Sequence, residues 1–320
     1  MDLIYMNGSM EDIGVLQNYE FDLAFGADEN SFACHIQAAD HCCKTGYYLY
    51  IEGTEYGGII DSITSDTDTG EVIYSGRTWH GILNSKIICP DTGKDYLVLS
   101  GEPHMVLRSL LQRLALTGLF SVSTVSTGLT IGSYQMPRYI AGYDGIQKLL
   151  ATVGCKLLFN FAGGHVVLTA WPKADYTDTE LDSDITSFRV QHTVRAVNHL
   201  ICLGKGELSN RMVVHLYSDP AGNISQTQSL FGLDEYTAVY DYPNVESASD
   251  LMAGGRDRLK ELGPGDSMSI DLTADEDIYD IGDLIGAVDN VTGITATAEI
   301  KKKVITIQNG QVTISYEVGD

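Results

Sequence analysis

Basic residues are scarce in this sequence, and their scarcity limits the partners that the protein can have. Only 20 Lys and Arg residues stand against 43 Asp and Glu residues, so the formal net charge is −23 over 320 residues. A surface of this sign repels polyanions, which excludes gripping nucleic acid through neutralised phosphates. The same repulsion would suit a passage lined with carboxylates, through which DNA could move without sticking.

Long apolar runs are also missing. No stretch of eighteen apolar residues occurs, and the N-terminal Met1–Tyr5 lacks the basic and apolar segments of a secretion signal. We therefore expect no membrane-spanning segment, and a protein that stays in a cytoplasm or leaves it without an N-terminal signal. The hydrophobic share of 44% and the charged share of 20% are those of a globular protein, and the length allows two or three domains.

Enzyme motifs are absent as well. The sequence has no Gly-x-Ser-x-Gly elbow, no His-Glu-x-x-His helix, no phosphate-binding Gly-x-x-x-x-Gly-Lys-Ser/Thr loop and no Gly-x-Gly-x-x-Gly after a strand. Among 43 carboxylates, a pair at the separation used by glycosidases occurs by chance, so their number does not indicate hydrolysis. We assign no catalytic, cofactor-binding or metal-binding residue and expect no enzyme and no cofactor.

The cysteines follow no disulfide framework, and we expect reduced thiols that mostly pack in the core. One local cluster mixes thiol and imidazole groups within ten residues, as a zinc site would. Its spacing matches no known zinc finger or ribbon, so packed thiols beside surface histidines are favoured and zinc binding stays open. The cysteines are Cys34, Cys42, Cys43, Cys89, Cys155 and Cys202, and the cluster is Cys34, His35, His41, Cys42 and Cys43.

The run Asp66–Glu71 resembles the opening of a calcium loop. A twelve-residue loop that starts at Asp66 needs a bidentate carboxylate at its last position, where Arg77 stands. A hairpin turn explains the same residues better.

Two stretches, one near each end of the chain, predict the same β-hairpin. Residues 57–77 alternate β-branched or aromatic with polar residues on both sides of a turn at 66–70, and residues 303–319 do so around a turn at 308–311. This similarity indicates either a duplicated β-domain or the coincidence of two common hairpins.

Helical periods interrupt the β-like sequence in three places. An apolar stripe follows Pro103, a shorter one runs over 144–154, and a third covers about 245–262. With a predicted hairpin over 156–171, the first two form an α+β unit, and the acidic run 175–184 is interpreted as a linker. We therefore expect a mainly β fold with α+β insertions, divided into β-domain 1–100, α+β domain 101–185 and β-domain 186–320.

Several single residues carry weaker expectations. Lys301–Lys303, the only basic run, is expected to protect an exposed strand from edge-to-edge pairing. Glu207 and Arg211 bracket a loop and are interpreted as a solvated turn pair. Trp79 and Trp171 stand in strand-like contexts, where packing is expected.

Several short strings are shared with one family. The strings are Glu55–Asp61, Tyr74–Trp79 with Ile87–Pro90, Asn198–Leu208 with Arg211, and Tyr279–Asp283. Together they resemble the tail-hub proteins of long-tailed phages of Gram-positive bacteria, in particular the N-terminal, baseplate-hub-like part of siphophage tail-associated proteins. The resemblance runs from about residue 19 to the end of the chain.

The resemblance implies an architecture and a place in the virion. Each chain would contribute two tube-like β-barrels and smaller α+β domains to a homotrimeric ring, which joins a sixfold tail tube or distal tail ring to the tail tip. DNA would pass through the ring without specific binding, next to the distal tail protein, the tape-measure protein and tip or receptor-binding proteins. The protein would be assembled in the host cytoplasm.

Family members often continue into a peptidoglycan-cleaving region, and because the sequence stops at Asp320 we expect no such activity. The alternatives are a tail-tip cell-wall hydrolase or carbohydrate-binding protein, and the hub of a contractile injection machine.

Overall fold

The computed structural model describes residues 1–182, 188–193, 196–263, 265–270, 272–274, 278–308 and 310–319. The fold is mainly β with a few helices, which confirms the expected fold class. The sheets of the described residues include no closed barrel, so the two barrels stay a prediction. The chain divides into two compact units, residues 1–189 with 268–320 (unit 1) and residues 190–267 (unit 2).

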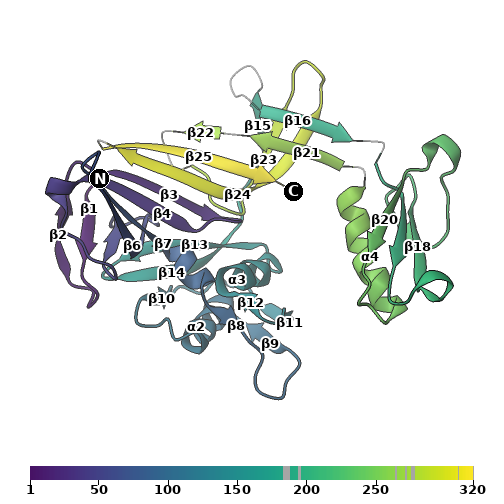
Figure 1. The fold of residues 1–320 in the computed structure, drawn as a ribbon, viewed down its shortest axis with the longest axis horizontal. Coiled ribbons are helices and arrows are strands. Elements are labelled where there is room, and N and C mark those ends of the chain that lie inside the picture. The colour runs from purple at the N-terminus through teal and green to yellow at the C-terminus, as the bar shows by residue number, and fades with distance from the viewer. Residues whose placement is uncertain are drawn as a thin grey trace. The chain divides into compact units, whose positions relative to one another are not determined.

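A twelve-stranded sheet organises unit 1 (Figure 1). It contains both predicted hairpins, β6–β7 and β24–β25, which are confirmed. Both hairpins belong to this one sheet, and β3 and β4 lie between them. Its order is β15 (Asp175–Asp182), β23 (Leu284–Val288), β24 (Thr295–Gln308), β3 (Glu20–Gly26), β4 (Ser31–Gln37), β7 (Glu71–Thr78), β6 (Gly57–Asp66), β5 (Tyr48–Tyr50), β1 (Leu3–Met6) and β2 (Asp12–Leu16), with β25 (Gln311–Gly319) on β24 and β22 (Leu272–Ala274) on β25.

The two ends of the chain meet in this sheet. Strand β24 pairs antiparallel with β3, so that yellow and purple strands lie side by side in Figure 1. Because the C-terminal strands return to the N-terminal ones, the compact units differ in extent from the three sequence domains, which stay a prediction. Alternate residues of β3 face the core: Phe21, Leu23 and Phe25 are buried there, while Glu20 and Asp22 stand on the other face.

The α+β part of unit 1 shares one core with the N-terminal strands. Met6, Tyr50 and Trp79 pack in the same buried cluster as the apolar faces of α2 and α3. Helix α2 begins with Pro103 after the N-cap Glu102, whose carboxylate accepts the backbone N–H of Met105 at 3.0 Å. The elements are α1 (Trp79–Asn84), α2 (Pro103–Arg113), α3 (Gly142–Ala151), the sheet β10 (Phe120–Val122), β14 (His165–Pro172) and β13 (Cys155–Ala162), the pair β8 (Ile87–Ile88) and β12 (Ile140–Ala141), and the pair β9 (Leu97–Gly101) and β11 (Ile131–Met136).

Unit 2 is a small sheet with helix α4 packed on it. Leu251 and Leu259 of α4 are buried against Leu200, Cys202 and Leu216 of the strands. The helix predicted over about 245–262 is confirmed. The sheet order is β19 (Ile224–Ser225), β18 (Val213–Ser218), β17 (His199–Leu203) and β20 (Thr237–Asp241), and α4 spans Ala248–Leu262; β16 (Phe188–Thr193) and β21 (Gly265–Ile270) form a separate pair.

The linker predicted over 175–184 is wrong for its described part. Residues Asp175–Asp182 form β15, which pairs in parallel with β23. The strand is held by more than backbone bonds, because the Tyr176 ring packs edge-to-face on Tyr279 at 5.1 Å. The acidic composition of this run predicts a linker, but a strand at the edge of a sheet can also carry many carboxylates, because they reach water there. Residues 183 and 184 lie outside the described residues.

The role predicted for Lys301–Lys303 is also wrong. Strand β24 is no free edge here, because it pairs with β3 on one side and with β25 on the other. Lys303 is 0% exposed. One sign of this was in the sequence, since strand periodicity places Lys303 on the same face as Ile305 and Ile307.

No helix of the described residues is long and apolar enough to span a membrane.

Candidate functional site

The face of the large sheet that is turned away from the core is the first candidate. Because residues paired in adjacent strands point to the same face, the strand registers define two rows of side chains across six strands. We call these rows the polar face. The rows are Thr313, Thr306, Asp22, Ala33, Ser75 and Ser62, and Gln311, Gln308, Glu20, His35, Ile73 and Thr64.

Short polar contacts hold the carboxylates of the polar face in place. The Thr306 hydroxyl donates to Asp22 Oδ1 at 2.6 Å, and the Gln308 amide donates to Glu20 Oε2 at 2.6 Å. Both donors are neutral, so these contacts bring no positive charge to the two carboxylates. Such a surface repels the phosphates of DNA.

The cations at the border of the polar face are already paired. The Arg77 guanidinium binds both oxygens of Asp61, at 2.7 and 2.8 Å, and this pairing lowers the pKa of Asp61. Lys302 lies 3.2 Å from Glu29 and 3.1 Å from Glu317. Each of these cations meets at least one carboxylate, so neither supplies a spare charge for a phosphate.

The sheet divides the proposed zinc cluster. Cys34 is buried on the core side, whereas His35 stands on the polar face with Nδ1 2.9 Å from Glu71 Oε1. His41 Nδ1 lies 2.9 Å from the Tyr74 hydroxyl, which also accepts the backbone N–H groups of Cys42 and Cys43. Within the ranges that the structure describes, no three His, Cys, Asp or Glu residues are placed to hold a metal ion.

The thiols and the calcium-like turn behave as local structure. All six cysteines are free, and Cys34, Cys43, Cys155 and Cys202 are buried, as expected of reduced core thiols. The Asp66 carboxylate accepts the backbone N–H groups of Asp68 and Thr69, which lowers the pKa of Asp66. These bonds close the turn of the β6–β7 hairpin.

The pair predicted between Glu207 and Arg211 does not form. Arg211 instead pairs with Asp241 of β20, and its Nε donates to the Gly204 carbonyl at 3.1 Å. The partner lies thirty residues away and could not be found from the loop alone.

A second candidate is a pocket of about 550 Å³ beside Trp171, which we call the Trp171 pocket. Trp79 is fully buried as predicted, but Trp171 is 55% exposed, so the packing predicted for it is wrong. Trp171 stands at the end of β14, paired with Lys156 of β13. Asn160, Thr169 and two carboxylates, Glu55 and Asp280, also line this pocket.

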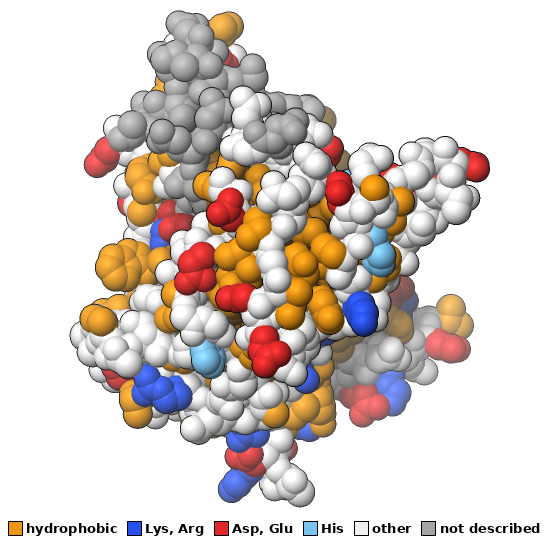
Figure 2. Space-filling view, turned by 90° about the vertical axis from the view of Figure 1, so that its left-hand side faces the viewer, with side chains coloured by type: hydrophobic (Ala, Val, Ile, Leu, Met, Phe, Trp, Pro, Cys, Tyr) orange, Lys and Arg blue, Asp and Glu red, His pale blue; other side chains and the backbone are white. Residues whose placement is uncertain are grey.

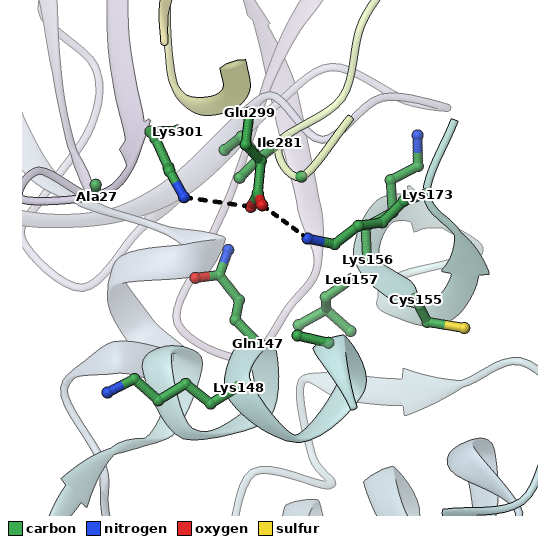
Figure 3. Close-up of a pocket in the computed structure, with 12 residues that line it drawn as sticks. Ala27, Gln147, Lys148, Cys155, Lys156, Leu157, Lys173, Ile281, Glu299 and Lys301 are labelled. Carbon is green, nitrogen blue, oxygen red and sulfur yellow. Dashed lines mark ion pairs between the residues drawn. The ribbon is translucent and has the colours of Figure 1, made fainter. Parts of the chain in front are cut away.

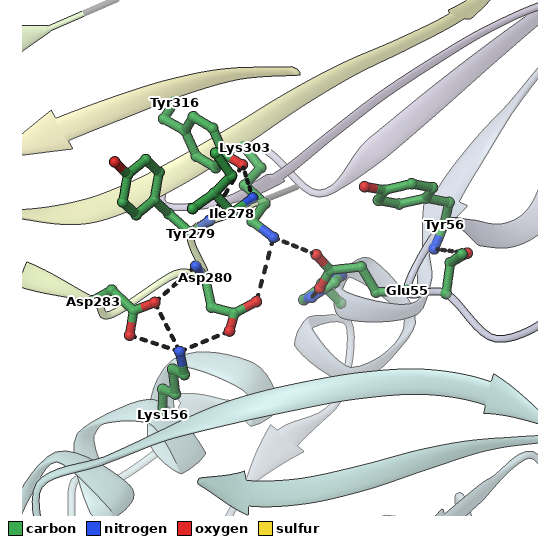
Figure 4. A network of polar contacts seen from close by, with 11 residues as sticks. Glu55, Tyr56, Lys156, Ile278, Tyr279, Asp280, Asp283, Lys303 and Tyr316 are labelled. Atoms are coloured by element: carbon green, nitrogen blue, oxygen red, sulfur yellow. Dashed lines mark hydrogen bonds and ion pairs between the residues drawn. The ribbon is translucent and has the colours of Figure 1, made fainter. Parts of the chain in front are cut away.

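Both carboxylates of the Trp171 pocket are held by lysines (Figure 4). Lys303 Nζ lies 2.8 Å from Glu55 Oε1 and 3.5 Å from Asp280 Oδ1. Lys156 Nζ donates to Asp280 at 2.7 Å and to both oxygens of Asp283, at 2.6 and 2.8 Å. We call these five residues the lysine–carboxylate network.

Glu55 is a poor proton donor in this setting. Burial raises the pKa of Glu55, but Lys303 and His80 together outweigh burial and hold the pKa at about 2. His80 itself is buried between Phe25 and Phe159, and burial lowers the pKa of His80. A general acid for glycoside cleavage has to be protonated near neutral pH, and Glu55 is ionised there.

The open edge of the large sheet is a third feature. Strand β2 is the last strand on its side, and its Ile13 and Val15 are 51% and 42% exposed. Figure 2 views the side of unit 1 on which β1 and β2 lie and shows hydrophobic side chains gathered among acidic ones. Exposed apolar edges of this kind are common at contacts with other chains.

Three solved structures with a fold similar to that of this chain are phage tail proteins. A 43 kDa tail protein of a Shewanella oneidensis prophage superposes with a TM-score of 0.54 at 13% identity, covering 99% of this chain and 98% of that one. The chain has a phage tail protein fold. A tail protein from Neisseria meningitidis gives a TM-score of 0.51 at 13% identity, with 100% and 96% covered, and a prophage tail protein from Listeria monocytogenes gives 0.51 at 15%, with 99% and 94% covered.

Sequence comparison adds no relative to this fold. No protein-family model and no curated protein matches the chain. The fold agrees with the resemblance to tail-hub proteins, and the three structures named above are described as tail proteins.

Proposed function

We propose that this protein is a structural subunit of a phage tail hub, and that three copies form a ring through which DNA passes. The ring would join the tail tube or distal tail ring to the tip of a long non-contractile tail. The two barrels of the domains 1–100 and 186–320 belong to this proposal, as do the tape-measure and tip proteins as neighbours and the virion tail tip as location.

The polar face is the observation that carries the proposal. Its two rows run across six strands from both ends of the chain, and they bring Glu20 and Asp22 together mostly with Ser, Thr and Gln side chains, beside Ala33, His35 and Ile73. A wall of this kind is wettable and repels phosphate, as a DNA passage requires. The open edge at β2 supplies an apolar surface for contact between copies.

Electron microscopy of the purified protein tests the ring. We expect threefold particles with a central hole about 20 Å or more across, wide enough for a duplex. Compact particles without a hole, or a stable monomer in light scattering at micromolar concentration, would reject it. Imaging of whole virions separates the non-contractile tail tip from the alternative, a contractile injection machine.

Charge reversal tests whether the polar face lines the hole. The double variant Glu20→Lys with Asp22→Lys places new cations on the polar face, so the assembled ring should retard DNA in a low-salt gel. The matched control Glu207→Lys with Asp257→Lys makes the same change of net charge on exposed residues of unit 2. If both variants retard DNA equally, or if neither variant retards it, the polar face is not the wall of the passage.

The Trp171 pocket favours a second candidate function, binding of cell-wall carbohydrate. An exposed indole beside Asn160 and Thr169 offers a stacking surface with polar groups at its edge. The lysine partners of Glu55 and Asp280 disfavour hydrolysis at the same place. N-acetylglucosamine oligomers should then change the Trp fluorescence of the wild type but not of Trp171→Ala; an unchanged response in Trp171→Ala, or no response in the wild type, rejects this candidate.

A further inference from the structure

Unit 1 has a second pocket that the proposed function does not use. It has a volume of about 290 Å³ and lies between α3, the start of β13 and the bend before β23. Four of the twenty basic residues of the chain line it, in a protein whose net charge is −23. We call it the lysine pocket. Its basic residues are Lys148, Lys156, Lys173 and Lys301.

The charges of the lysine pocket do not cancel. Lys173 and Lys301 converge on a single carboxylate, Glu299, at 3.0 and 3.6 Å (Figure 3). Lys156 forms ion pairs with Asp280 and Asp283, so it adds no unpaired charge to the pocket. Lys148, on α3 at the rim, has no ion-pair partner among the described residues. Lys173 and Lys301 share the carboxylate of Glu299, and Lys148 adds a third ammonium group to the lining, which leaves a local surplus of positive charge.

The shape of the pocket keeps this surplus accessible. Gly282 has a φ of +100°, and a side chain added there would meet Lys156 Cβ at 3.2 Å and Lys173 Cε at 3.5 Å. A glycine at this bend thus leaves the space beside Lys173 free. A carboxylate that entered would find ammonium groups on two sides, and lysines bind such anions as point charges without strict geometry.

Assembly of the proposed ring needs contacts of opposite charge. Three copies, each with a charge of −23, repel one another, so a stable ring requires local attraction that outweighs this repulsion. Each copy carries 43 carboxylates and can supply the anion itself. In a threefold ring every contact joins two different surfaces, because a cyclic ring of three is closed by head-to-tail interfaces.

We propose that the lysine pocket receives carboxylate side chains of a neighbouring copy of this chain and forms part of the contact between subunits. This inference rests on the proposed ring. It goes beyond it by naming the surface that one subunit offers to the next and the chemistry that the next subunit must present.

Carbodiimide cross-linking tests the contact directly. The reagent converts a carboxylate into an O-acylisourea, and a nearby lysine amine attacks its acyl carbon and expels the urea, so that an amide forms and the carbodiimide takes up the water. A mixture of unlabelled and ¹⁵N-labelled protein separates cross-links between copies from those within one. We expect cross-links between copies from Lys148, Lys173 or Lys301. Such cross-links only from other lysines would overturn the proposal.

Charge reversal supplies an independent measurement. Lys148→Glu with Lys173→Glu should weaken association at least tenfold in mass photometry, and the loss should shrink as NaCl is raised. The control Lys205→Glu with Lys260→Glu makes the same charge change on exposed lysines of unit 2. Its loss of association should be smaller than that of the Lys148 and Lys173 variant. Equal losses in both variants would overturn the proposal.

The outcomes separate the contact from the ring. If the double variant at Lys148 and Lys173 forms the same rings as the wild type, the lysine pocket is not a contact between subunits, whereas the proposed ring still holds. If association is lost in this variant but the wild-type particles have no central hole, the contact is supported and the DNA passage is rejected. Loss of binding to inorganic phosphate in the variant, with unchanged association, would assign the pocket to a small anion and overturn the proposal.

Discussion

Lys156 on β13 donates to both carboxylate oxygens of Asp283, at 2.6 and 2.8 Å, although the two residues stand 127 positions apart. The Lys156 side chain is 4% exposed and that of Asp283 is 0% exposed. Asp283 also accepts the backbone N–H groups of Ala174 and Asp280. The pair therefore fastens the α+β part of unit 1 to the bend that leads into the C-terminal strands.

Removal of one partner should be costly. Lys156→Met leaves the Asp283 carboxylate buried without its cation, and we expect a loss of about 3–5 kcal/mol in the free energy of unfolding. Urea titration followed by Trp fluorescence measures it, because both tryptophans lie in unit 1. Arg138→Met, which removes an exposed pair with Asp95, should cost less than about 1 kcal/mol. Similar losses in both variants would contradict a central role for Lys156.

Acid should weaken unit 1 partly through Glu55. The pKa of Glu55 is about 2 in the folded chain, against an ordinary value of 4.5, so the folded state favours the ionised form. Its contribution is fully present above pH 4.5 and is lost as the pH falls towards 2; its size is on the order of 3 kcal/mol. Glu55→Gln should therefore differ most from the wild type at pH 6 and least near pH 2. Parallel stability curves for the two proteins would contradict this assignment.

Local patterns predicted the elements of this fold better than their partners. The alternation in residues 57–77 and 303–319 predicts two hairpins, because a half-buried strand repeats every two residues. It cannot say that β24 pairs with β3, which joins Thr306 to Asp22 across 284 positions. Such pairings depend on the packing of the whole unit and leave no sign in either strand alone.

The candidate site shows the same limit. Strand period alone puts Glu20 and Asp22 on one face, but the rows of the polar face exist only once six strands are in register. The exposure of Trp171 could not be predicted, because the sequence of β14 is that of an ordinary half-buried strand. Whether its outer face is covered depends on the other elements that pack there. Lys303 belongs to a basic run in the sequence, but strand periodicity places it on the same face as Ile305 and Ile307, which are buried.

The two tryptophans should differ in emission wavelength and in quenching by acrylamide. In Trp171→Phe only the buried Trp79 emits, so the spectrum should be blue-shifted and acrylamide should quench it weakly. In Trp79→Phe the exposed Trp171 remains, and emission should be red-shifted and readily quenched. Stability should follow burial: Trp79→Ala should cost about 3–5 kcal/mol and Trp171→Ala much less. Equal quenching of the two single-tryptophan proteins would contradict the exposure of Trp171.

The β6–β7 hairpin should tolerate no side chain at Gly76. A Cβ there would lie 1.8 Å from the carbonyl oxygen of Ile59, because the strands approach closely beside the irregular pairing between Ile60 and Ser62. Backbone atoms cannot yield as a side chain can, so Gly76→Ala should cost at least about 2 kcal/mol in urea unfolding.

Gly132 in β11 provides the control for Gly76, because no atom lies within 4 Å of an added Cβ. Gly132→Ala should leave stability unchanged or raise it slightly, since alanine restricts the unfolded chain. The polar face runs through Ser62 and Ser75 of the same hairpin, so Gly76→Ala should also lose the ring in electron microscopy while Gly132→Ala keeps it. A Gly76→Ala protein of wild-type stability that still forms rings would show that the close approach of β6 and β7 is not needed for assembly.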